Sequence, residues 1–200
     1  MDDEQRRAIV LFFPNLNALS HNIELGLLTS IIVNDCSLEI YCDPIDESDV
    51  LDGLRKLFSV FSVLQSQAER EGKTLDEDEL PKLWLLVPSV TVDLLNGFGA
   101  HLNPGWPCGV YFMAEAFKVA IVAINELAVT RETLWLRLLG RGETQRQAID
   151  ELLALPVNNL LRQKILRLIN HWHTALVQNL DDLTPDEQEL VINLSVVCQS

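Results

Sequence analysis

Three short runs of apolar, strand-forming residues constrain the fold most strongly. They lie at 8–13 (AIVLFF), 83–87 (LWLLV) and 119–124 (VAIVAI). Runs of five or six residues without polar alternation are typical of strands that are covered on both faces. Between the first two runs, apolar residues recur every three or four positions from Val50 to Ala68, which predicts a long amphipathic helix after a capping Asp46. The alternation of such strands and helices predicts an α/β fold.

Two further strands and several helices complete the expected order. We predict strands at 37–41 and 110–113 and helices at 17–33 and 89–95, the latter capped by Ser89. In the strand at 37–41, Leu38 and Ile40 lie on one face, while Glu39 and Tyr41 lie on the other, so we expect it to be covered on one side only. After Asn125 the patterns are helical only, at 132–139, 144–155, 161–180 and the chain end. The chain therefore divides into an α/β core at 1–127 and a helical extension at 128–200.

The charge balance and the cysteine spacing of the chain exclude several classes of protein. The chain has 15 basic and 29 acidic residues and a net charge of −14, which disfavours nucleic acid as a partner, because phosphates are held mainly by cationic side chains. The acidic N-terminal residues and the lack of an apolar stretch long enough to span a membrane predict a cytoplasmic protein that does not associate with a membrane. Its four cysteines form no CxxC pair, as expected of reduced thiols rather than a zinc site. No glycine-rich nucleotide motif occurs, so no cofactor is expected.

One segment departs from the acidic balance. Residues 131–167 hold seven basic and four acidic side chains. Gly140-Arg-Gly142 opens a helix there, and Arg137, Arg141 and Arg146 are the candidate contacts for an anion or for DNA, because exposed helix-start amides favour negative charge. The alternative interpretation is a joint between two helices whose arginines pair with nearby carboxylates.

The carboxylates near one strand are the candidate catalytic residues. A two-strand nuclease site needs an Asp at the end of one strand and an acid-x-Lys on the next, so that the acids hold Mg²⁺ and the lysine orients water. Asp35 and Glu39 are the available acids, but Tyr41 stands where the lysine would be, and the nearest lysine is Lys56 on the following helix. The alternative interpretation of Glu39 is a solvent-facing strand carboxylate.

Several strings point to a family. LWLLVP (83–88), LLNGFGA (94–100), GWPCGVYFM (105–113), AIVAIN (120–125) and ETLWLRLLGRGETQRQAI (132–149) together resemble a group of uncharacterised proteins from phototrophic bacteria. That group is related to the PD-(D/E)XK nuclease-like superfamily, on the branch of recombination-promoting nucleases and transposases. The resemblance covers about half of the chain and implies a restriction-endonuclease-like mixed sheet flanked by helices, with a C-terminal helical extension.

The same resemblance shows where the site departs from the family. If residues 7–13 form the equivalent of the family's Asp-bearing strand, Ile9 occupies the position of the catalytic Asp. The next acid-bearing strand of the family then corresponds to residues 38–41, in which Glu39 is retained and the lysine is missing. This favours a degenerate nuclease-like fold that serves as a protein-interaction or regulatory module and binds a protein partner or forms a homodimer. The alternative is a Mg²⁺-dependent DNA nuclease with an atypical site, the only case in which Mg would be a cofactor.

Overall fold

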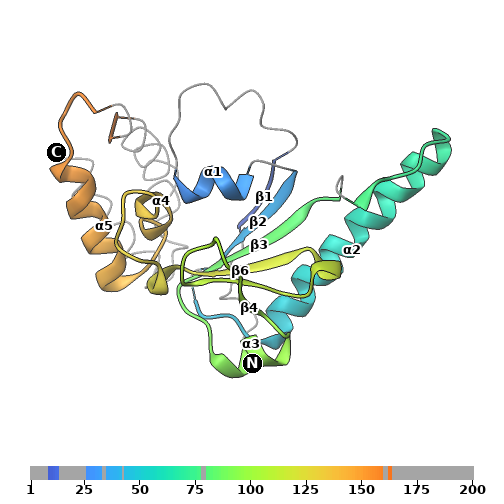
Figure 1. The fold of residues 1–200 in the computed structure, drawn as a ribbon, viewed down its shortest axis with the longest axis horizontal. Coiled ribbons are helices and arrows are strands. Elements are labelled where there is room, and N and C mark those ends of the chain that lie inside the picture. The colour runs from blue at the N-terminus through green and yellow to red at the C-terminus, as the bar shows by residue number, and fades with distance from the viewer. Residues whose placement is uncertain are drawn as a thin grey trace, which may run out of the picture.

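We analysed a computed structural model, which describes residues 9–13, 26–32, 35–41, 43–77, 80–159 and 162–163, with only the backbone described at 9–13. Seven segments of this part of the chain are helical and six are strands (Figure 1). In chain order they are β1 (Ile9–Phe13), α1 (Leu27–Ile32), β2 (Cys36–Ile40), α2 (Glu47–Arg70), β3 (Lys82–Val87), α3 (Val92–Gly97), β4 (His101–Leu102), β5 (Val110–Phe112), η3 (Glu115–Phe117), β6 (Val119–Ala123), η4 (Ile124–Glu126), α4 (Leu134–Arg137) and α5 (Gly142–Ala154).

The strands form one mixed sheet in the order β1-β2-β3-β6-β5-β4. β2, β3 and β6 run parallel to one another, whereas β1 pairs antiparallel with β2, and β5 pairs antiparallel with both β6 and β4. The two central strands β3 and β6 are buried almost throughout, as their unbroken apolar runs predict. The predicted α/β class with a mixed, helix-flanked sheet is therefore confirmed.

Helices cover both faces of this sheet. On one face, α2 and α3 contribute Val50, Leu54, Leu57 and Leu95 to a core that includes Leu85 and Ile121 of the central strands. On the other face, Leu27 and Ile31 of α1 and Leu136 of α4 pack with Trp84, Leu86 and Val122. Leu136 belongs to this hydrophobic core. The first described helix after residue 128, α4, therefore packs on the same core as the sheet.

Helix α2 follows its predicted limits closely. The side chain of Asp46 accepts hydrogen bonds from the backbone N–H groups of Ser48 and Asp49, and the Asp49 carboxylate accepts one from the Asp46 N–H. This capping box satisfies backbone donors that the first turn would leave free. Only the first half of α2 carries fully buried side chains, and the helix extends past the strands at its far end (Figure 1).

Some local predictions are wrong. Thr91 rather than Ser89 caps α3, because the Thr91 hydroxyl accepts from the Leu94 N–H at 3.2 Å. The sequence patterns do not predict the short strand β4, and α4 is a single turn at Leu134–Arg137 within the predicted helix 132–139. Within the predicted helix 17–33, α1 covers Leu27–Ile32, while residues 17–25 and 33 lie outside the described residues. Gly26 directly precedes α1, and its positive φ of 56° lets its backbone lie against Glu132. Most of the helix predicted at 161–180, and the one at the chain end, lie outside the described residues.

No helix within the described part of the chain combines the length and the apolar character needed to span a membrane.

Candidate functional site

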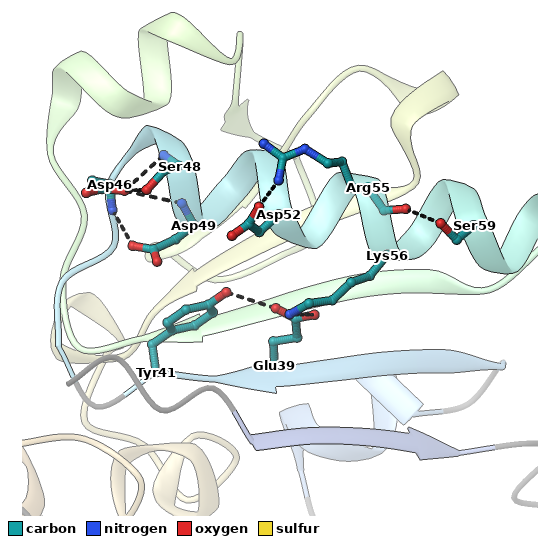
Figure 2. Close-up of polar contacts among 9 residues, drawn as sticks. All are labelled: Glu39, Tyr41, Asp46, Ser48, Asp49, Asp52, Arg55, Lys56 and Ser59. Atoms are coloured by element: carbon teal, nitrogen blue, oxygen red, sulfur yellow. Dashed lines mark hydrogen bonds and ion pairs between the residues drawn. The ribbon is translucent and has the colours of Figure 1, made fainter. Parts of the chain in front are cut away.

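Glu39 is the fourth of the five residues of β2 and lies on the face that α2 covers (Figure 2). Its side chain is 1% exposed and Tyr41 is 5% exposed, so the expectation of a half-covered strand with a solvent-facing carboxylate is wrong. The alternation of the strand is real, but α2 packs over the polar face as well. Glu39 is therefore a buried acid, and its charge has to be compensated inside the protein.

Two side chains compensate the charge of Glu39, one at each carboxylate oxygen. The Tyr41 hydroxyl donates to Oε2 of Glu39 at 2.8 Å, and the Lys56 ammonium donates to Oε1 at 3.1 Å. Lys56 reaches down from α2, while its side chain remains 52% exposed (Figure 2). Both carboxylate oxygens thus have a charged or polar partner, which a buried carboxylate requires.

Gly53 brings the helix close enough for this contact. A Cβ at position 53 would lie 3.0 Å from Cδ2 of Leu83 and 3.7 Å from Oε2 of Glu39. Because glycine destabilises a helix interior by about 1 kcal/mol relative to alanine, a glycine here has a packing role. It lets the α2 backbone approach the sheet at the residue that carries the buried acid.

The surroundings of Tyr41 keep its hydroxyl neutral. Burial raises the pKa of Tyr41 well above its ordinary value, and the hydrogen bond to Glu39 and the charges of Glu39, Asp49 and Asp52 raise it further. The phenol therefore acts as a donor to the carboxylate over the whole physiological range. Together the three side chains form a neutralised unit, Lys56–Glu39–Tyr41, which we call the buried triad.

Asp35, the other candidate acid, lies away from Glu39. Asp35 precedes the first residue of β2, four positions away, which corresponds to about 13 Å along an extended strand. The register partners of Glu39 are Val10 in β1 and Leu85 in β3, and neither of these aliphatic residues can bind a metal ion. No group of three His, Cys, Asp or Glu side chains that could hold a metal ion is found within the residues that the structure describes.

The three candidate arginines, Arg137, Arg141 and Arg146, do not form one surface. Arg137 is 0% exposed, and its guanidinium makes paired hydrogen bonds of 3.0 and 2.7 Å to the two carboxylate oxygens of Glu151. Arg141 is the half-buried residue before α5, and Arg146 is exposed, with its Nε 3.7 Å from Glu143. A Cβ at Gly140 would lie 2.9 Å from Ile124, so this turn packs tightly against η4.

Sequence reasoning missed two contacts, Lys56 with Glu39 and Arg137 with Glu151. For the first, a signal was present, because Gly53 interrupts a helix interior on the side of the apolar stripe, one turn before Lys56. For the second, no local pattern exists, since the pair joins positions 14 residues apart across a turn.

A spectroscopic titration checks the environment of both tyrosines of the chain. In β5, Tyr111 donates to Glu126 at 2.5 Å, and this bond, with burial, raises the pKa of Tyr111 to about 12. Because both pKa values are raised in the folded state, the stabilisation is complete below pH 10 and is lost as the pH rises from 10 through the folded values. We expect almost no phenolate absorbance near pH 10 in the native protein, whereas in urea both tyrosines have their ordinary pKa of about 10 and about half of the phenol groups are ionised at this pH. A native titration near pH 10 would contradict the two hydrogen bonds.

Comparisons with family models, with curated proteins and with solved structures find no significant match to this chain.

Proposed function

We propose that the chain is a degenerate nuclease-like domain that works as a protein-interaction or regulatory module rather than as a hydrolase. The observation that carries this proposal is the buried triad. Glu39, the acid that the resemblance to PD-(D/E)XK proteins retains, is 1% exposed, and both of its oxygens are held by Tyr41 and Lys56. A carboxylate engaged in this way joins α2 to the sheet, and both of its oxygens already have partners.

The surface of α2 supports an interaction role. Leu51, Phe58 and Val63 are 38%, 41% and 56% exposed, and the Phe58 ring lies 5.8 Å from the ring of Phe61. Leu51 and Phe58, seven positions apart, lie on the same side of this projecting helix, and exposed apolar side chains that share a face are typical of protein contact sites. The excess of acidic residues gives a field that favours a protein over a nucleic acid as the partner.

Light scattering after size exclusion, combined with affinity capture, tests this role. We expect either a particle of twice the chain mass of 22.6 kDa or a captured partner, and we expect Phe58→Ser to weaken the association without unfolding the chain. The matched control is Ser59→Ala, an exposed position on the same helix. A strictly monomeric chain that captures no partner would contradict the proposal.

One contact favours the second candidate, a Mg²⁺-dependent DNA nuclease. Lys56 supplies from α2 the ammonium group that such a site needs beside its acid, 3.1 Å from Glu39. In that case Glu39 would bind the metal ion and Lys56 would orient the attacking water. This candidate requires metal-dependent DNA cleavage that Glu39→Gln abolishes, whereas the interaction module requires none.

A further inference from the structure

A row of side chains crosses the sheet on the face opposite to the buried triad. Register partners align Leu38 in β2, Trp84 in β3, Ala120 in β6, Phe112 in β5 and His101 in β4. Ala120 is the smallest residue of the row, so the rings of Trp84 and Phe112 reach across β6 and meet edge to face, with their centroids 5.7 Å apart.

A third ring comes from the loop between β4 and β5. The Trp106 centroid lies 5.2 Å from the rings of both Trp84 and Phe112. Trp84 is 2% exposed, whereas Trp106 and Phe112 are half-buried and keep part of their surface open. We call Trp84, Trp106 and Phe112 the aromatic cluster.

Lys82 places a cation beside these rings. Its Nζ lies 5.7 Å from the Trp84 ring centroid and 5.3 Å from that of Phe112. Burial lowers the pKa of Lys82, and the charge of Lys118 lowers it further, while Glu115 acts in the opposite direction. Among the described residues no carboxylate lies within ion-pair distance of this ammonium.

Lys82 is a half-buried cation in a strongly acidic chain. Acidic residues outnumber basic ones by 29 to 15, so an anionic neighbour is easy to supply. The neighbours of Lys82 are instead two rings and a second lysine, Lys118, while the charge of Glu115 acts on Lys82 from beyond ion-pair distance. Since a cation–π contact is weak compared with a charge-assisted hydrogen bond, the ammonium retains the capacity to pair with an anion.

We propose that the aromatic cluster and Lys82 bind a small planar anion, a ligand that joins an aromatic ring to a negative group, as nucleotides and aromatic carboxylates do. The ring stacks on the open surfaces of Trp106 and Phe112, and the negative group pairs with Lys82, with Lys118 as the second cation. The net charge of −14 favours a small ligand over a polynucleotide, because Lys82 and Lys118 can neutralise only one or two negative groups. This proposal is independent of the relationship to nucleases.

Nitrogen–proton NMR of the tryptophan indoles tests it on the full chain. The four indole N–H signals are assigned with one Trp→Phe variant each, and adenosine monophosphate and indole-3-acetate are then titrated separately. We expect saturable shifts of the Trp84 and Trp106 signals and none of Trp135, which lies in α4. Adenosine, which lacks the charge, is expected to bind at least about tenfold more weakly than its monophosphate, and inorganic phosphate alone is expected to leave the indoles unshifted.

Two variants and a control locate the site. Lys82→Met is expected to weaken binding about tenfold, and Trp106→Ala to abolish the ligand-induced shift of Trp84. Lys73→Met removes an exposed lysine beyond the end of α2 and is expected to leave binding unchanged. A response to either probe supports the proposal and identifies its source as nucleotide or carboxylate. No shift with either probe at millimolar concentration, or equal affinities in Lys82→Met and the unmodified chain, would overturn it.

Discussion

Replacing Lys56 with methionine is expected to lower the free energy of unfolding by about 2 kcal/mol at pH 7. The substitution leaves the charge of Glu39 buried with Tyr41 as its one remaining partner within the described residues. Removing one partner of a fully buried ion pair costs roughly 3–5 kcal/mol, and the cost is smaller here because Lys56 itself is half exposed. Urea denaturation followed by circular dichroism measures the loss.

A double-mutant cycle separates the charge from the packing. Glu39→Gln keeps an oxygen that accepts from Tyr41 and removes the charge, so we expect it to cost less than Lys56→Met. In Glu39→Gln, the further change Lys56→Met should be nearly neutral, which gives a coupling energy of about 1–2 kcal/mol. Arg55→Met, which removes the exposed cation next to Lys56, is the matched control and should cost little. A Lys56→Met variant as stable as the unmodified chain would show that the ammonium does not stabilise the buried acid.

Replacing Glu151 with glutamine is expected to destabilise the chain by about 3 kcal/mol, which is the largest effect that we predict. Arg137 is fully buried and makes four hydrogen bonds, to both Glu151 oxygens, to the Thr130 carbonyl and to the Thr133 hydroxyl. The variant keeps most of the shape but leaves the guanidinium charge uncompensated in the interior. Thermal unfolding should show a clear fall in Tm relative to the unmodified chain.

Two companion variants make this result specific. Glu143→Gln changes the exposed acid that lies near Arg146 and should leave Tm within the error of measurement. Arg137→Met with Glu151→Leu removes both charges and should recover part of the stability, because a buried pair replaced by apolar groups is often neutral. If Glu151→Gln and Glu143→Gln behaved alike, Arg137 would not depend on Glu151 for its charge balance.

The strands and the long helix could be predicted because their signals are local. β3 and β6 are unbroken apolar runs, and α2 carries its own cap at Asp46 and its own stop at Gly72, which has a positive φ of 66°. In contrast, β4 has only two residues and no alternation, so nothing in its sequence separates it from a turn. Ser89 and Thr91 are both good caps, and the tertiary position of α3 decides between them.

Apart from the signal of Gly53 in α2, the arrangement of the site depends on information that no local pattern carries. Whether Glu39 faces solvent depends on which helix crosses β2, and that is set by packing of the α2 stripe on Leu83 and Leu85. Arg137 looks like a surface residue, yet α4 packs with the sheet core on one side and with α5 on the other. A single turn held between two cores has no free face, so its arginine is buried and takes Glu151 as a partner.

DNA cleavage is the measurement that tests the assignment of Glu39 most directly. Supercoiled plasmid is incubated with the unmodified chain, with Glu39→Gln and with Lys56→Met, each in Mg²⁺, in Mn²⁺ and in a chelator. If Glu39 serves the contact between α2 and the sheet, none of the three proteins nicks the plasmid above the chelator control. Metal-dependent nicking by the unmodified chain that Glu39→Gln abolishes would contradict this account and establish the nuclease.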